Sequence, residues 1–279
     1  MVLFSAKIEP GSNEKQTMDE EKSVSTRIEQ EQTGWASVAR SRVWPALRAW
    51  LAPEQRKRYR AWIFQGYILV SLIAFVILTI FASLAAYFEV DLEITLAIQN
   101  AIPPWLGTFL YWVSWPGYVT GTIVVAGALI TILVFLGLRW ESLIALLTGA
   151  AATILNNLIK FAIRRPRPDS DLVDVFESLT SYTFPSGHVM FYTAFFGFMA
   201  FLSFTLVKRG WLRGVLVSIF GLLVLLIGLS RIYLGEHWAS DVVGAYLLGF
   251  LILIATIRIY RRGLQRRMTH TGGESEPEP

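Results

Sequence analysis

Two long segments of this 279-residue chain contain no charged residue. Residues 61–88 are uncharged over 28 positions, and residues 94–138 are uncharged over 45 positions. About 20 apolar helical residues cross the hydrocarbon core of a bilayer, so the first segment suits one crossing and the second is too long for one. Charged residues make up only 16% of the chain, whereas roughly a quarter of a soluble domain is charged. These runs predict an integral membrane protein and argue against a soluble helical bundle.

Proline and glycine divide the longer segment at Pro103-Pro104 and at Pro116-Gly117. The division predicts a short interfacial helix at 105–115 and a crossing at 119–138. The other predicted crossings are apolar segments of similar length, at 61–88, 141–162, 187–207, 213–231 and 241–258. The predicted fold class is therefore all-α, a six-transmembrane-helix bundle with an interfacial helix and polar cytoplasmic tails.

The segments outside the crossings differ from them in composition. Residues 5–34 are rich in Ser, Glu, Gln, Lys and Thr and lack helical periodicity, which predicts a disordered tail and not a secretory signal. Residues 35–51 mix apolar side chains with arginines, a pattern that fits either a helix on the membrane surface or a second piece of linker. The predicted organisation is a cytoplasmic tail at 1–60, a membrane domain at 61–260 and a polar cytoplasmic tail at 261–279.

Most Lys and Arg residues outside the crossings fall on one side of the predicted membrane. They precede the first crossing, separate the second from the third and the fourth from the fifth, and follow the sixth: Arg56, Lys57, Arg58, Arg60, Arg139, Lys208, Arg209, Arg213, Arg258, Arg261, Arg262, Arg266 and Arg267. The positive-inside rule makes this side cytoplasmic and puts both termini there. The net charge of +4 then follows from membrane topology, so we expect a multi-pass protein of the cell membrane and no nucleic-acid partner.

The opposite, outer side should be poor in cations, yet ionisable residues gather there. They are Lys160, Arg164, Arg165, Arg167 and Arg231, together with two of the three histidines, His188 and His237. Each has a plainer explanation when taken alone, such as anchoring a helix end at lipid headgroups or capping a helix. Because ionisable groups at membrane depth are costly, their joint arrangement predicts a functional site.

Three segments carry that arrangement. Lys160 is followed, after six residues, by Arg167-Pro168; the second segment is Pro185-Ser186-Gly187-His188; and the third is Ser230-Arg231, five residues, His237, three residues and Asp241. In this order they resemble the tripartite signature of the type 2 phosphatidic acid phosphatase / vanadium haloperoxidase superfamily. The six-helix layout resembles the membrane branch of that family. Each segment alone is weak, whereas the set is specific; residues before 61 and after 260 lie outside the resemblance.

The residue types in these segments suit a phosphate group. Phosphoryl transfer builds charge on the equatorial oxygens, so catalysis is largely positioning and electrostatic stabilisation. Lys160 supplies a compact ammonium, whereas Arg167 and Arg231 supply planar guanidinium groups that suit bidentate contact. Gly187 lets the backbone approach an anion, and Ser186 can donate a hydrogen bond at the start of a helix, where anions are favoured.

Other charged residues near these segments match no signature position. Arg164 and Arg165 are assigned to lipid headgroup contact. Glu89, Asp91 and Glu93 are assigned to the outer membrane interface.

The histidines are the candidate reactive groups, because the chain has no cysteine and a neutral imidazole can attack phosphorus. His237 and Asp241 lie four residues apart, so on a helix the carboxylate could hold one ring nitrogen protonated and leave the other free. Spacing alone does not say which histidine attacks. The resemblance implies that His237 is the nucleophile and forms a phosphohistidine, that His188 protonates the leaving oxygen and that Asp241 orients His237. A metal site at these three residues is the rival, but three nearby cations would repel a divalent ion, so neither metal nor cofactor is expected.

The predicted function is an integral membrane lipid phosphatase that hydrolyses phosphate monoesters or diphosphates at the outer face. The resemblance implies phosphatidate, phosphatidylglycerol phosphate, diacylglycerol diphosphate or polyprenyl diphosphate as the substrate class. One alternative is a lipid phosphotransferase with the same site. Another is an anion transporter, which would use the cations but would need neither Pro185-Ser186-Gly187-His188 nor the His237–Asp241 pair. Haloperoxidase activity is disfavoured because those relatives are soluble. The sequence does not name the lipid, because the apolar helix faces that contact acyl or prenyl tails look alike in composition. It does not give the oligomeric state either.

Overall fold

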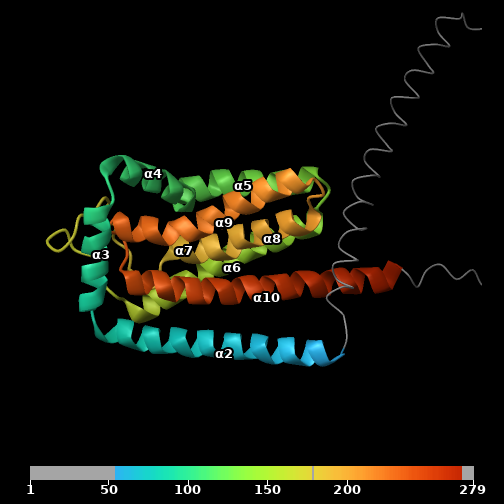
Figure 1. Cartoon of the computed structure of the whole chain (residues 1–279), viewed down its shortest axis with the longest axis horizontal. Helices are drawn as coiled ribbons and strands as arrows, with labels where there is room; N and C mark the ends of the chain where they lie inside the picture. Colours follow the sequence, from blue (N-terminus) through green and yellow to red (C-terminus); the bar gives the residue numbers. More distant parts are fainter. Residues whose placement is uncertain (1–53, 178, 272–279) are drawn as a thin grey trace, which may run out of the picture. The chain divides into compact units, whose positions relative to one another are not determined.

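The computed structural model describes residues 54–177 and 179–271. All secondary structure in these residues is helical, and they contain no strand. Most of the helices run along one direction as a bundle, so the predicted all-α membrane fold is confirmed (Figure 1). The predicted surface helix or linker at 35–51 and the polar tail before it lie outside the described residues.

The helices follow the predicted crossings closely. In chain order they are α2 (Glu54–Leu84), α3 (Glu89–Ala101), α4 (Pro104–Ser114), α5 (Val119–Phe135), α6 (Arg139–Ile163), α7 (Gly187–Phe191), α8 (Gly197–Leu206), α9 (Gly210–Tyr233) and α10 (Ala239–Thr271). A 3-10 turn, Trp115–Gly117, joins α4 to α5, and a π-helical turn, Tyr192–Phe196, joins α7 to α8. Among the described residues, five helices are long and apolar enough to cross a membrane. The pair formed by α4 and α5, bent by 68°, supplies a sixth crossing when it is counted as one span.

Helix α3 was not expected as a helix. It lies across one end of the bundle, between the ends of α2 and α4 (Figure 1). Its first turn holds Glu89 and Asp91, and carboxylates there suit the positive end of the helix dipole. The Asp91 carboxylate also accepts a hydrogen bond from the backbone N–H of Phe88 at 3.2 Å. Acidic residues that suggest only an interface in the sequence therefore begin a helix.

The crossing that begins at Gly187 forms the centre of the bundle. Two thirds of it (67%) is buried inside the protein, against 17% to 39% for the other four spans that cross alone. Its buried aromatic side chains pack against one another and against neighbouring helices: Phe191, Tyr192, Phe195, Phe196 and Phe198. The second signature segment opens this helix, so the tightly packed core fixes its backbone.

Candidate active site

The three signature segments meet at the end of the bundle that α3 covers. Lys160 and Arg231 lie in the last turns of α6 and α9, and His188 lies in the first turn of α7. His237 lies just before α10, and Asp241 lies in its first turn. The structure thus brings to one place helix ends that are separated by about 80 residues of sequence.

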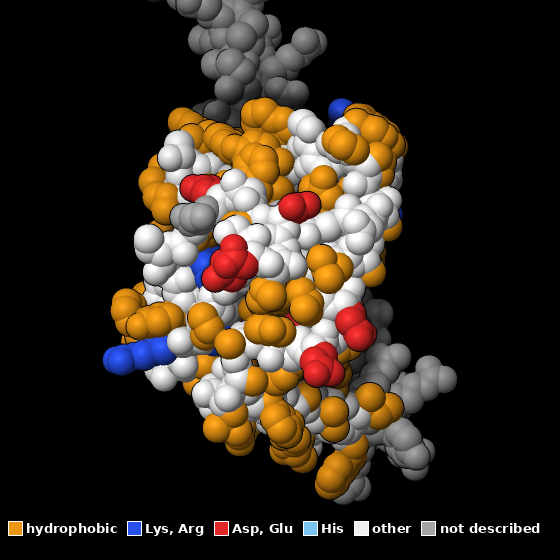
Figure 2. All heavy atoms as spheres, turned by 90° about the vertical axis from the view of Figure 1, so that its left-hand side faces the viewer, with side chains coloured by type: hydrophobic (Ala, Val, Ile, Leu, Met, Phe, Trp, Pro, Cys, Tyr) orange, Lys and Arg blue, Asp and Glu red, His pale blue; other side chains and the backbone are white. Residues whose placement is uncertain are grey.

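The cations of this end are mostly buried. The side chains of Lys160, Arg165 and Arg231 are 8%, 1% and 0% exposed, and Arg167 is half-buried. Only Arg164 is exposed among these five. Figure 2 views this end, where hydrophobic patches and a few acidic side chains lie among uncharged groups and few Lys or Arg side chains are visible. The cations therefore form an interior cluster and not a cationic surface for headgroups.

Helix α6 contains Lys160 of the first signature segment, and two of its side chains bind the backbone of the loop that contains the second. Lys160 Nζ donates a hydrogen bond to the carbonyl of Tyr182 at 2.7 Å. One turn earlier, Asn156 Nδ2 donates to the carbonyl of Pro185 at 2.9 Å. A side chain at position 187 would press on Asn156, since a Cβ there would lie 3.0 Å from Oδ1. Close packing against α6 therefore favours glycine at this position, in addition to the approach of an anion that the sequence predicts.

Arg167 lies beside the ring of His237. Its Nε donates to the carbonyl of Ser181 at 2.7 Å, and its Nη1 donates to the carbonyl of Glu236 at 2.6 Å. Nη1 is also 3.5 Å from Nε2 of His237. Burial lowers the pKa of Arg167 to about 10, so its guanidinium is still charged at neutral pH.

His188 packs against the turn between α4 and α5. Its ring meets the ring of Tyr118 edge to face, with 4.8 Å between the centroids. There is no room for a side chain at Gly117, because a Cβ there would overlap the imidazole of His188. The kink between α4 and α5, which the sequence marks only as a break, thus shapes one wall of the site.

Three buried polar atoms of the signature residues have neither a hydrogen-bond partner nor an ion-pair partner within the described residues. They are Oγ of Ser186, Nε2 of His188 and Nε of Arg231. Buried polar atoms are normally bonded, and an exception calls for an explanation. All three belong to residues predicted to contact phosphate or the leaving oxygen, and a phosphate group supplies the oxygens that such groups bind.

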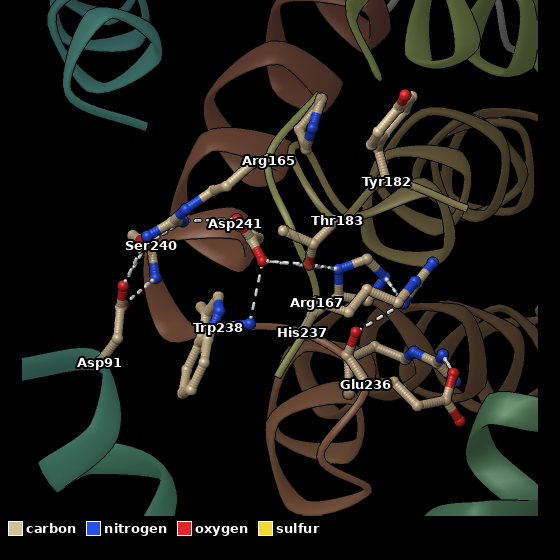
Figure 3. Close-up of polar contacts among 12 residues, drawn as sticks. Asp91, Arg165, Arg167, Tyr182, Thr183, Glu236, His237, Trp238, Ser240 and Asp241 are labelled. Carbon is tan, nitrogen blue, oxygen red and sulfur yellow. Dashed lines mark hydrogen bonds and ion pairs between the residues drawn. The ribbon is translucent and has the colours of Figure 1, made fainter. Parts of the chain in front are cut away.

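His237 is backed by Thr183 in addition to Asp241. Oγ1 of Thr183 lies 3.0 Å from Nδ1 of His237 and donates to Oδ2 of Asp241 at 2.5 Å. The separation between Nδ1 and Oδ2 is 3.6 Å, longer than a hydrogen bond. The expected direct contact between imidazole and carboxylate is therefore replaced by one bridged through a hydroxyl (Figure 3). Oδ2 also accepts from the backbone N–H of Trp238 at 2.9 Å, which fixes the carboxylate away from the ring.

The surroundings keep His237 neutral. Burial, followed by the charges of Arg167 and Lys160, lowers the pKa of His237 well below its ordinary value. Burial penalises the charged ring and cations repel it. At neutral pH the imidazole therefore has one ring nitrogen with a free lone pair.

The prediction that Arg165 contacts lipid headgroups is wrong, because the residue is buried. Its guanidinium forms ion pairs with Asp241 at 2.6 Å and with Asp91 at 3.0 Å. Its Nε donates to the carbonyls of Ala85 and Ala86, just after the end of α2. The preceding Arg164 has a φ of 56° at the end of α6, and this left-handed turn directs the chain so that the two arginines diverge.

The prediction that Asp91 lies at the membrane interface is also wrong, because Asp91 is buried inside the protein and only 1% exposed. Besides Arg165 it accepts hydrogen bonds from the backbone N–H of Ser240 at 2.8 Å and from the Ser240 hydroxyl at 2.7 Å. Helix α3 is thereby tied to the start of α10. The contact joins residues 149 positions apart, which explains why no local sequence pattern indicated it.

Arg231 has an internal carboxylate partner that the sequence analysis missed. It forms an ion pair with Glu236 and donates from Nη1 to the hydroxyls of Tyr118 and Ser114, each at 3.2 Å. The Tyr118 hydroxyl donates to Oε1 of Glu236 at 2.6 Å. The one available signal was the position of Glu236 next to His237 in the third segment, because an acid there is close to a predicted nucleophile.

Comparison with known proteins identifies the family. Residues 141–264 match the model of the PAP2 superfamily, so the match includes all three signature segments. Over 156 residues the chain is 33% identical to phosphatidylglycerophosphatase B of Bacillus subtilis, an alignment that covers 53% of this chain and 72% of that protein. Over 135 residues it is 26% identical to an undecaprenyl-diphosphatase of Sulfolobus acidocaldarius, with 47% of this chain and 61% of that protein covered.

A solved structure supports the same conclusion for the fold. The crystal structure of a transmembrane PAP2 type phosphatidylglycerolphosphate phosphatase from Bacillus subtilis matches with a TM-score of 0.60 and 25% sequence identity. The match covers 70% of this chain and 96% of that one. In sequence and in fold, the chain belongs to the PAP2 superfamily.

Proposed function

We propose that this multi-pass membrane protein is a lipid phosphatase in which His237 attacks the phosphorus atom. The relatives reported above carry the names of lipid phosphatases. The single observation that carries the proposed role is the position of Nε2 of His237, which lies 3.5 Å from Nη1 of Arg167. A neutral ring nitrogen beside a cation suits attack on an anionic phosphate, because the cation attracts the substrate and does not compete as a base.

In the first step of the proposed reaction, the buried cations bind the phosphate oxygens. Nε2 of His237 forms a bond to phosphorus, and the bond from phosphorus to the lipid oxygen breaks with its electron pair leaving on that oxygen. His188 gives that oxygen a proton. In the second step, the water oxygen forms a bond to phosphorus while the bond from phosphorus to Nε2 of His237 breaks and its electron pair returns to the ring. His188 takes a proton from the water, and phosphate leaves. Ser186 and the backbone at Gly187 bind the phosphate during both steps.

The proposed mechanism needs no metal ion or other cofactor. Three cationic residues surround the phosphate position, Lys160, Arg167 and Arg231, and they supply the positive charge that a divalent ion supplies elsewhere. A divalent cation would be repelled by them. Activity should therefore persist in EDTA, and vanadate should inhibit because it can adopt the five-coordinate geometry of the transition state.

The proposed substrates are lipids with a terminal phosphate monoester or diphosphate, of the phosphatidate, phosphatidylglycerol phosphate, diacylglycerol diphosphate or polyprenyl diphosphate class. Water is the proposed acceptor; a phosphotransferase would use the same phosphohistidine with another one. The test is phosphate release from a panel of these lipids by purified protein, with and without EDTA, alongside the His237→Ala variant. Turnover that requires an added metal would contradict the mechanism. No turnover of any lipid phosphate, together with anion flux in liposomes, would favour a transporter.

We further propose that both termini are cytoplasmic and that the site faces outward. The positive-inside rule supports this, since the basic residues that separate or follow the crossings lie at the opposite helix ends. A cysteine introduced at Asp171, in the exposed loop beside the site, should react with an impermeant maleimide in intact cells. A cysteine at Arg209 should not react, and the absence of native cysteine keeps the background low. Labelling only at position 209 would invert the topology.

A further inference from the structure

Thr183 occupies the space between the proposed nucleophile and its carboxylate. It is fully buried, and it lies two residues before Pro185, outside the signature positions. Its backbone N–H donates to the carbonyl of Arg165 at 2.9 Å, which fixes the loop at this point. Its side-chain oxygen is then 3.0 Å from Nδ1 of His237 and 2.5 Å from Oδ2 of Asp241 (Figure 3).

The direction of these hydrogen bonds follows from counting protons. The groups around Asp241 are all donors: the guanidinium of Arg165 at Oδ1, and the Trp238 N–H and the Thr183 hydroxyl at Oδ2. The ionised form of Asp241, the carboxylate, can accept all three of these hydrogen bonds. A hydroxyl has one proton and two acceptor lone pairs. Since the proton of Thr183 is directed at Asp241, its oxygen accepts, and the partner it accepts from is Nδ1–H of His237.

This arrangement selects one tautomer of His237. With the proton on Nδ1, the lone pair of the neutral ring is on Nε2. Nε2 has Nη1 of Arg167 at 3.5 Å, and a guanidinium only donates. Both neighbours of the ring therefore favour the same tautomer, and it is the one that can attack phosphorus.

We propose that Thr183 is a positioning residue of phosphoryl transfer, whose hydroxyl links Asp241 to Nδ1 of His237 and keeps Nε2 free to attack. The tautomer it imposes is a property of the free protein, whereas its effect on rate rests on the proposed function. When the ring becomes phosphorylated it carries positive charge, and the same hydroxyl connects that charge to the carboxylate. Thr183 itself touches neither phosphate nor lipid.

The test compares Thr183→Val, which has nearly the same shape without the hydroxyl, with Thr183→Ser, which keeps the hydroxyl. Thr183→Val should lower the rate of phosphoenzyme formation by ~10- to 10²-fold, as does the loss of the hydrogen-bond partner behind a metal-ligating histidine. KM should change little, because no phosphate contact is removed. Thr183→Ser should stay close to the wild-type rate. Thr183→Ala serves in place of the valine variant if valine prevents folding.

A second measurement reads the tautomer directly. With only three histidines in the chain, nitrogen-15 spectra of histidine-labelled protein contain few ring signals, and His237→Ala identifies the relevant pair. We expect a protonated Nδ1 and an unprotonated Nε2 in the wild type and in Thr183→Ser. In Thr183→Val only Arg167 still favours this tautomer, so part of the population should carry the proton on Nε2.

The outcomes separate this proposal from the proposed function. Wild-type tautomer and wild-type phosphorylation rate in Thr183→Val would overturn the role of Thr183, and so would equal defects in the valine and serine variants. A phosphoenzyme that still forms in His237→Ala would remove the proposed nucleophile. Even then, the nitrogen-15 measurement would decide whether Thr183 selects the tautomer of His237.

Discussion

The ring of His237 separates two regions of opposite character. Behind it, every side-chain oxygen and nitrogen of Asp91, Arg165, Thr183 and Asp241 takes part in a hydrogen bond or ion pair (Figure 3). In front of it, Ser186, His188 and Arg231 each have a buried polar atom with no partner among the described residues. The side chains of the rear region thus satisfy one another, whereas the three front residues keep polar atoms that the proposed phosphate could bind.

The charges differ in the same way. The rear region contains one cation, Arg165, and two carboxylates, which neutralise it in excess. The front region contains three cations, Lys160, Arg167 and Arg231, and one carboxylate, Glu236. A phosphate monoester carries nearly two negative charges, so it would balance the excess of two positive charges in front. If the proposed function holds, the rear region provides stability and alignment, while the front region gives up stability in order to bind phosphate.

The largest expected effect comes from breaking the rear region with Arg165→Met. The variant leaves Asp91 and Asp241 buried without their shared cation, and removing one partner of a buried ion pair typically costs ~3–5 kcal/mol. We expect a marked loss of thermal stability in detergent and loss of phosphatase activity, because Asp241 no longer holds its position. Thermal unfolding of the purified protein measures the first effect, and phosphate release measures the second.

The neighbouring residue supplies the control for this experiment. Arg164 is exposed, and its Nε donates to the carbonyl of Phe161 within the same helix end. Arg164→Met should therefore leave the unfolding temperature and activity nearly unchanged, since exposed substitutions usually fall within about 0.5 kcal/mol. Similar losses in the two variants would show that Arg165 acts as one more surface cation, and the division into two regions would fail on the rear side.

A substitution in the front region should lower activity with a smaller loss of stability. His188→Ala removes the proposed acid, and a positioned general acid contributes ~10²- to 10⁴-fold to the rate. We expect that loss on a lipid phosphate, whose alkoxide needs a proton in order to leave. The initial burst of nitrophenol from nitrophenyl phosphate should fall far less, because nitrophenolate leaves readily without one. Unfolding temperature should fall less than in Arg165→Met, since the change removes the ring's packing on Tyr118 but leaves no buried charge unpaired, and Nε2 of His188 has no hydrogen-bond partner among the described residues.

The burst must be measured because His188 also takes part in the second step, in which water attacks the phosphohistidine. Rapid-mixing kinetics on both substrates provide the comparison, with the phosphoenzyme as the observed species. Equal defects in the burst on both substrates would remove His188 from the role of acid.

The front region was largely predictable from the sequence, and the rear region was not. Lys160, Arg167, Ser186, His188 and Arg231 follow a spaced pattern with a chemistry that the residue types express by themselves. The crossings were equally readable, because a lipid environment requires long uncharged segments. Both features depend on local sequence or on residue type, which is why sequence alone identifies them.

The rear region depends on contacts between distant parts of the chain. Asp91 reaches Arg165 across 74 positions and Ser240 across 149. Thr183 reaches Asp241 across 58 positions. A threonine in a loop and an aspartate near a helix start are both ordinary in sequence, and only folding makes them neighbours of His237. Arg165 was misread for the same reason, because two adjacent arginines look alike until the turn at Arg164 sends one inward.

The smallest expected effect comes from Glu236→Gln, which tests the balance of charge in the front region. Glu236→Gln removes the carboxylate charge beside Arg231 and keeps an oxygen that can accept from the Tyr118 hydroxyl. The excess of positive charge around the phosphate position then rises from two to three. Inorganic phosphate and vanadate should bind more tightly by about tenfold, because a unit charge a few ångströms away at an effective dielectric constant near 20 contributes at least this much. Inhibition constants for the two anions measure the change.

Glu177→Gln is the matched control, since Glu177 is an exposed acid that lines the same outer pocket as Glu236. Solvent and salt screen an exposed charge, so its removal should change the inhibition constants far less. If Glu236 instead serves mainly to hold Arg231 in place, the glutamine variant will bind phosphate no better or more weakly. That result would mean that the protein fixes the cations of the front region as firmly as it fixes Arg165 in the rear region. The contrast between the two regions would then depend only on the unbonded atoms of Ser186, His188 and Arg231.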